Sequence, residues 1–135
     1  MSRYLLDTNT ISQFVKKKAS AHAFERLNHS DASQICVSIV SRAEVLFGLV
    51  RAANPPKLSA TVEAFFQTVE ILDWDEGTAQ ACAKLRSATE SEGMGMGALD
   101  LMIAAQAMAA GATLVTNDGA LKRLTPWLPV EDWTL

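Results

Sequence analysis

The sequence predicts an α/β fold in which a central parallel sheet of about five strands is flanked by helices on both faces. Short apolar segments alternate with longer helical segments along the 135 residues. Strands that are apolar on both faces belong to parallel sheets that are covered on both sides. No repeat and no long linker divides the chain. The length therefore fits a single domain, residues 1–135, that is large enough for a hydrophobic core.

Apolar runs and turn residues set the elements that we expect in the first half of the chain. Tyr4-Leu5-Leu6 lies in the first strand, and Thr8 and Asn9 are residues that commonly start helices. Asn54-Pro55-Pro56 interrupts the helical pattern, because proline cannot continue a helix. The expected elements are a strand at 3–7, helices at 8–17 and 19–29, a strand at 35–38, and helices at 41–51 and 58–69.

Glycines mark the element ends in the second half of the chain. Gly93, Gly95 and Gly97 separate two helical segments, and Gly111 follows the second in the position that glycine usually takes at a helix end. The expected elements are a strand at 70–73, helices at 76–92 and 98–110, and strands at 113–116 and 130–133.

The composition is that of a soluble globular protein and says little about its ligands. The chain is 49% hydrophobic and 20% charged, with a net charge of −3, a balance that neither marks a nucleic-acid-binding protein nor excludes one. No apolar run is long enough to span a membrane, and the N-terminus does not resemble a signal peptide. Cys36 and Cys82 lie far apart in apolar segments, which indicates buried thiols in a reducing compartment. We therefore expect a cytoplasmic protein.

Four carboxylates recur at the points where ligands gather in such folds. Asp7 follows the first strand directly, and Asp118 lies two residues beyond the run 113–116. Ligands of open α/β sheets bind beyond the carboxyl ends of the strands. Glu44 and Asp100 lie near the starts of two helices. Asp100 also shares a helix face with apolar residues, where a lone charge is costly.

Each carboxylate also has a local explanation. Asp7 and Asp118 can cap helices or form turns. Asp100 can complement a helix dipole, and Ser41 with Glu44 matches a capping box. The recurrence at one sheet edge favours a shared site. Two charges about 4 Å apart repel by roughly 4 kcal/mol at an effective dielectric of 20, so converging acids call for a hard cation such as Mg²⁺ or Mn²⁺.

Four segments, taken in order, resemble one known family. "LLDTN", "EVLFG", "DLMIAAQA" and "LVTND" are similar to the motifs of PIN-domain nucleases, and more narrowly to those of the VapC-like toxins of bacterial toxin–antitoxin pairs. The ordered set covers essentially the whole chain and implies a PIN-like three-layer sandwich. It also implies site roles for six residues, namely an acidic quartet of Asp7, Glu44, Asp100 and Asp118 around Mg²⁺ or Mn²⁺, with Asn9 and Thr116 as polar supports.

The resemblance further implies a metal-dependent endoribonuclease that hydrolyses phosphodiester bonds in RNA, leaving 5′-phosphate and 3′-hydroxyl ends. Asp7, Asp100 and Asp118 would hold the metal, directly or through water. Glu44 would complete the site or orient the attacking water. The implied partners are a VapB-like antitoxin and a second copy of the chain, in a homodimer and in a toxin–antitoxin hetero-oligomer. Two features depart from the family: Leu121, where an aromatic residue is common, and the stretch "GMGMG".

Other interpretations are weaker but stay open. A catalytically inert PIN-like chain could serve as a protein-binding module, although it would have no physical reason to keep four mutually repelling acids. "GMGMGALD" follows a helix and lacks the third glycine of a dinucleotide-binding loop. "DTN" lacks the second aspartate that haloacid-dehalogenase-like phosphatases need. His22 and His29 have no acidic or thiol companions at ligand spacing, which argues against a zinc site or histidine catalysis.

The remaining features have structural interpretations. The run Lys16-Lys17-Lys18 is expected at a solvated helix end, with phosphate contact as the alternative. Phe47 and the pair Phe65-Phe66 are expected in the core, with an antitoxin groove or a dimer face as the alternative. The three tryptophans are expected to be packing residues.

Overall fold

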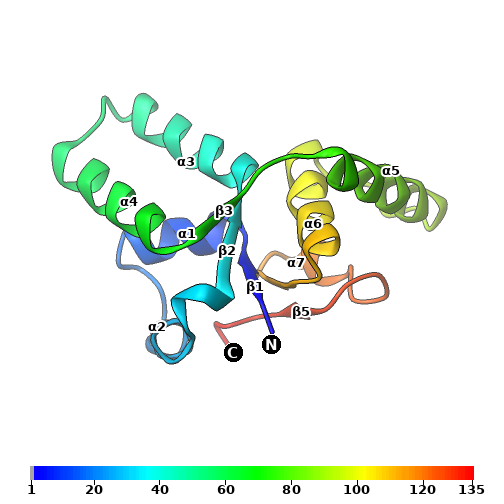
Figure 1. Ribbon diagram of the computed structural model, residues 1–135, viewed down its shortest axis with the longest axis horizontal. Coiled ribbons are helices and arrows are strands. Elements are labelled where there is room, and N and C mark those ends of the chain that lie inside the picture. Colours follow the sequence, from blue (N-terminus) through cyan, green and yellow to red (C-terminus); the bar gives the residue numbers. More distant parts are fainter. Residues whose placement is uncertain (1) are drawn as a thin grey trace.

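Five parallel strands form the central sheet of the computed structural model, which describes residues 2–135 (Figure 1). The strand order is β3-β2-β1-β4-β5, so β1 lies at the centre. The strands are β1 Tyr4–Leu6, β2 Ile35–Ser38, β3 Glu70–Leu72, β4 Thr113–Val115 and β5 Val130–Glu131. The predicted fold class, strand number and strand direction are confirmed.

Helices cover both faces of the sheet. In Figure 1, α3 and α4 lie on one side of the strands, and α5 and α6 lie on the other. The helices are α1 Thr8–Val15, α2 Ala21–His29, α3 Ile39–Arg51, α4 Pro56–Thr68, α5 Glu76–Ser91, α6 Ala98–Ala110 and the short α7 Gly119–Lys122, with a 3₁₀ turn, η1, at Ala32–Gln34. The arrangement is the three-layer sandwich expected for a parallel sheet that is apolar on both faces.

Alternate residues of each strand divide the core into two halves. Leu5 and its neighbour Leu114 pack with α5 and α6, whereas Leu6 and Val115 pack with α1, α3 and α4. All four side chains are at most 1% exposed. Successive strand residues point to opposite faces, so the continuous apolar runs in the sequence follow from burial on both sides.

The start of α3 differs from the prediction. The helix begins at Ile39, because Ser38 at the end of β2 is its N-cap and accepts a hydrogen bond from the Val40 backbone N–H at 3.0 Å. Ser41 lies inside the helix, so the predicted capping box of Ser41 and Glu44 is wrong. The strand therefore runs directly into the helix, and this leaves Glu44 free for another role.

Other element ends show why the expected boundaries moved. α1 stops at Val15, and Lys17 just beyond it adopts a left-handed φ of 57°. The three lysines of this turn are exposed, as predicted for a solvated helix end. α4 starts two residues early, at Pro56, because the first helical position needs no backbone N–H donor. Gly111 ends α6 with a φ of 63°, as predicted.

The aromatic residues divide between core and surface. Phe66 is buried as predicted, but Phe47 is 60% exposed, so the core prediction is wrong for Phe47. Trp133 is buried and packs edge-on against Tyr4, with ring centroids 5.5 Å apart. The start of β1 therefore lies beside the last residues of the chain, as Figure 1 shows.

The structure contains no disulfide between the two cysteines. Cys36 and Cys82 are free, and burial raises the pKa of the Cys36 thiol to about 11. Within residues 2–135, no helix combines the length and the apolar character needed to cross a membrane.

Candidate active site

A cleft of about 350 Å³ opens at the edge of the sheet where β1 and β4 end. This is the carboxyl edge, where ligands of parallel α/β sheets gather. All four predicted carboxylates contribute to its lining, which consists of Asp7, Thr8, Asn9, Ser12, Glu44, Asp100, Asn117, Asp118 and Leu121. Residues that are as far apart in sequence as positions 7 and 118 thus meet in one place.

Asp7 is fixed by hydrogen bonds to both carboxylate oxygens. Its Oδ1 accepts from the Thr10 backbone N–H at 2.8 Å, which caps α1, and its Oδ2 accepts from the Thr116 hydroxyl at 2.5 Å. The side chain is almost fully buried, with 3% exposed. The local capping role and the site role therefore coexist, because a carboxylate has about four acceptor positions and these bonds use two.

Thr116 connects the first carboxylate with the fourth. Its buried hydroxyl oxygen accepts from the Asp118 backbone N–H at 3.0 Å while the hydroxyl donates to Asp7. Asp118 caps α7, since its Oδ1 accepts from the backbone N–H groups of Ala120 and Leu121. The expected support role of Thr116 thus has a physical basis: it fixes the spacing between two site aspartates.

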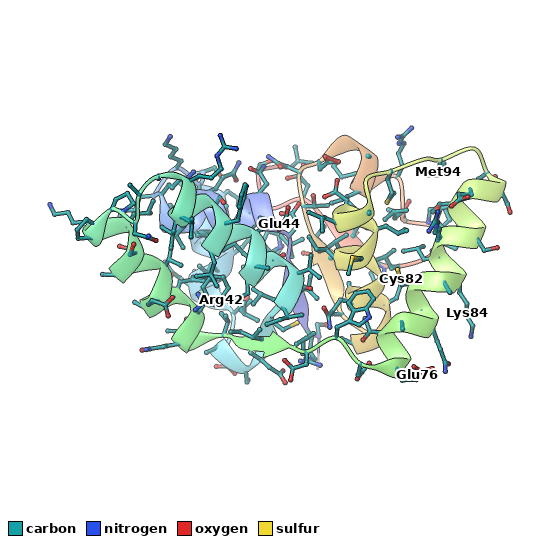
Figure 2. All side chains as sticks on the ribbon, turned by 90° about the horizontal axis from the view of Figure 1, so that it is seen from above. Arg42, Glu44, Glu76, Cys82, Lys84 and Met94 are labelled. Atoms are coloured by element: carbon teal, nitrogen blue, oxygen red, sulfur yellow. The ribbon has the colours of Figure 1, made fainter. Side chains whose placement is uncertain are left out.

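Glu44 enters the cleft from α3 and is held by Thr8. The Thr8 hydroxyl donates to Glu44 Oε1 at 2.6 Å and lies 2.9 Å from the Ser41 hydroxyl. A hydroxyl has a single proton to donate. When Thr8 donates to Glu44, the Ser41 hydroxyl is therefore the donor to Thr8. In Figure 2, Glu44 lies between the ribbons of α3 and α6, whereas Arg42 points toward α4.

Asp100 occupies the first turn of α6, where the negative charges of the other three carboxylates act on it. No residue in the described range 2–135 forms a hydrogen bond with its side chain, and the N-cap of the helix is Gly97. Burial raises the pKa of the Asp100 carboxyl, and the charges of Asp118, Glu44 and Asp7 raise it further. The cleft is therefore a region of concentrated negative potential, which stabilises a bound cation.

Asn9 lies at the exposed rim of the cleft. Its Nδ2 donates to Asn117 Oδ1 at 3.1 Å, so Asn9 supports a second rim residue and not a carboxylate directly. Sequence reasoning missed Asn117, Thr8 and Ser41 as part of the site. Thr8 and Asn117 each lie beside a predicted carboxylate in sequence, whereas the local pattern marked Ser41 only as a helix cap.

The donor atoms of the cleft fit a hard divalent cation. They are carboxylate oxygens without thiolate or imidazole partners, the set that Mg²⁺ and Mn²⁺ prefer. Among residues 2–135, no three Asp, Glu, His or Cys side chains stand close enough to bind one metal ion directly. Mg²⁺ commonly keeps several waters and uses only one or two direct carboxylates, so contacts through water suit this spacing.

Together, fold and cleft define a class: an α/β protein with an acidic site at the carboxyl edge of a five-stranded parallel sheet. The PIN domain model matches residues 4–125, which is most of the chain. The chain belongs to the PIN-domain family, and the resemblance seen in the sequence is confirmed.

Relatives match over nearly their whole length. The chain is 32% identical to the tRNA(fMet)-specific endonuclease VapC of Salmonella typhimurium (strain LT2), over 98% of this chain and 99% of that protein. It is 31% identical to the tRNA(fMet)-specific endonuclease VapC of Shigella flexneri, over 99% and 100%. It also matches a chain in the crystal structure of DNA-bound VapBC from Salmonella typhimurium, with a TM-score of 0.88, 32% identity, and coverage of 98% and 99%.

Proposed function

We propose that the protein is a toxin of the VapC kind, an endoribonuclease that needs a divalent metal ion and acts in the cytoplasm as a single nuclease domain, residues 1–135. The observation that carries the proposal is the meeting of four carboxylates in one cleft of a PIN-domain chain. Two relatives are named tRNA(fMet)-specific endonucleases, which supports the same activity. Of their substrate specificity, we propose for this chain only the class of substrate, which is RNA.

In this proposal, Asp7, Asp100 and Asp118 hold Mg²⁺ or Mn²⁺, directly or through water. A cation in such a site polarises the scissile phosphate and lowers the pKa of a bound water. Glu44 completes the site or orients the attacking water. Attack on phosphorus breaks the bond to the 3′ oxygen, which leaves 5′-phosphate and 3′-hydroxyl ends.

The protein itself supplies position and charge. The Thr10 N–H and the Thr116 hydroxyl fix the Asp7 carboxylate before any ligand arrives. The Thr8 hydroxyl fixes one oxygen of Glu44, and in this proposal its other oxygen binds water or substrate. Preorganisation of this kind lowers the reorganisation needed during the reaction.

We further propose two protein partners, a VapB-like antitoxin and a second copy of the chain. The solved VapBC complex of a relative supports the first. An apolar face of α3 supports the second, formed by Ile39, Leu46, Phe47 and Val50. These four side chains are 36 to 65% exposed, and exposed apolar patches commonly mark protein–protein contacts.

Cleavage of total cellular RNA tests the proposed activity. We expect purified protein to make defined cuts with Mg²⁺ or Mn²⁺ and none with a chelator. Asp7→Asn should abolish cleavage, because it removes a charge from the site while asparagine keeps an oxygen for the Thr10 N–H. A circular-dichroism spectrum should show that this variant is folded. Equal cleavage by wild type and variant would identify a contaminant nuclease and leave the inert binding module as the better description.

A further inference from the structure

One polar side chain is buried in the most apolar helix of the protein. Gln106 lies on α6, whose other buried residues are all leucine, isoleucine or alanine, and only 2% of it is exposed. A buried amide costs free energy unless its donors and acceptor are paired. The cleft does not include Gln106, so its presence needs another explanation.

The amide of Gln106 joins three separate elements. Its Oε1 accepts from the Ser38 hydroxyl at 2.6 Å, and its Nε2 donates to the Asp73 backbone carbonyl at 2.8 Å. Ser38 is fully buried and is also the N-cap of α3, where its oxygen accepts from the Val40 N–H. One side chain on α6 thereby holds the start of α3 and the segment that leaves β3.

These contacts bear on the spacing of two site carboxylates. Glu44 lies six residues after Ser38 on the helix that Ser38 caps, and Asp100 lies six residues before Gln106 on α6. The Ser38–Gln106 hydrogen bond thus joins α3 and α6 at points that lie six residues from Glu44 on one helix and six residues from Asp100 on the other. Glu44 and Asp100 line the same cleft, so the two acids lie close enough for their separation to matter.

We propose that Gln106 is a positioning residue, which sets the distance between Glu44 and Asp100 through its hydrogen bond to Ser38. This inference rests on the proposed metal-dependent function and adds a residue that acts on the site from outside it. A buried hydrogen bond prefers a narrow range of distances and a nearly straight donor angle. It therefore fixes the crossing of α3 and α6 more narrowly than apolar packing would.

The test is Mn²⁺ binding to the purified protein, measured by the electron paramagnetic resonance signal of free Mn²⁺, together with RNA cleavage measured over a series of RNA concentrations that gives kcat and KM. Gln106→Met keeps the size of the side chain and removes both hydrogen bonds. Because Gln106 acts on the carboxylates only through the helices that carry them, we expect Mn²⁺ binding to weaken by roughly tenfold, the lower end of the loss caused by removing a direct partner of a metal ligand. We expect a comparable fall in kcat with little change in KM. If this variant does not fold, Ser38→Ala removes the bond to Gln106 with a smaller change of volume, together with the N-cap bond to the Val40 N–H.

Two controls separate positioning from general destabilisation. Trp133→Phe removes buried contacts beside Tyr4, away from the cleft, so it should lower the Tm without changing Mn²⁺ affinity. The double variant Ser38→Ala/Gln106→Met should weaken Mn²⁺ binding by less than the two single variants combined, because each single variant already removes the bond that the two residues share.

The outcomes are distinguishable. If wild type binds Mn²⁺ and Gln106→Met binds it equally well with an unchanged kcat, the positioning role of Gln106 is wrong and the proposed function stands. The same conclusion follows if Trp133→Phe weakens Mn²⁺ binding as much as Gln106→Met does. If wild type binds no Mn²⁺ and cuts no RNA, the proposed function and the positioning role both fail.

Discussion

Thr8 is the only side chain in the described residues that donates a hydrogen bond to Glu44. Thr8→Val keeps the shape of the side chain and removes that donor, so the Glu44 carboxylate should lose its fixed orientation. We expect kcat for RNA cleavage to fall by roughly tenfold, measured at saturating RNA. Thr8→Ser keeps the hydroxyl and should retain most of the activity. Equal losses in both variants would mean that the methyl group matters and the hydrogen bond does not.

Asp100 should make the metal-free protein sensitive to pH. Burial and the neighbouring carboxylates raise its pKa in the folded state, so the folded protein binds this proton more tightly than the unfolded chain does. The free energy of unfolding should therefore fall as the pH rises from the ordinary carboxyl range through the raised pKa. Asp100→Asn should remove part of this fall and raise the Tm in chelator at pH 7 by a few degrees. Urea unfolding across this pH range measures the effect.

Added metal should reverse the order of the Tm values of wild type and Asp100→Asn. Mg²⁺ or Mn²⁺ stabilises only a folded state that binds it, so it should raise the Tm of wild type more than that of Asp100→Asn. Equal shifts would remove Asp100 from the metal site. A higher Tm for Asp100→Asn in chelator would then reflect charge repulsion alone.

Two glycines should respond in opposite directions to the same substitution. Gly48 lies within α3 with helical backbone, and a Cβ added there would meet no atom within 4 Å. Gly48→Ala should therefore raise the free energy of unfolding by about 0.5–1 kcal/mol. Gly111 has a φ of 63°, so Gly111→Ala should lower it by roughly 1 kcal/mol. Thermal or urea unfolding gives both values, and a loss of stability in Gly48→Ala would contradict the first expectation.

The helix starts show how far sequence patterns reach at the scale of one element. Ser38 and Ser41 are both good N-caps, and the pattern with Glu44 favoured the wrong one. Ser38 is the actual cap because β2 delivers the chain there and Gln106 pairs with the same hydroxyl. Tertiary contacts decide which of two nearby serines caps the helix, and a local sequence pattern carries no information about those contacts.

At the scale of the whole molecule, we expect the apolar face of α3 to mediate self-association. The double variant Phe47→Glu/Val50→Glu places two charges on this face and should shift a dimer to a monomer, measured by sedimentation equilibrium. Ala64→Glu/Gln67→Glu adds two charges at exposed positions of α4 and should leave the assembly unchanged. A wild-type chain that is monomeric at micromolar concentration would contradict the proposed dimer.

The sequence allowed prediction of the sheet and of the meeting of the four acids in one cleft, because both depend on the order of the elements along the chain. Strands that are apolar on both faces imply parallel pairing, and parallel strands end at one edge. Asp7 and Asp118 come just after two of these strands, so both were expected at that edge. The contacts that fix Glu44 join residues 36 positions apart, and the Ser38–Gln106 bond spans 68. Such contacts depend on how helices cross, which sequence periodicity does not specify.

The edge-on packing of Tyr4 against Trp133 has a practical consequence for protein engineering. It brings the beginning of the central strand beside the last turn of the chain. A short flexible linker can therefore connect Trp133 and Tyr4, and a circular permutant can open instead in the exposed turn at Ala53 and Asn54. Because β1 runs from that junction toward the cleft, the linker would leave the acidic edge unobstructed.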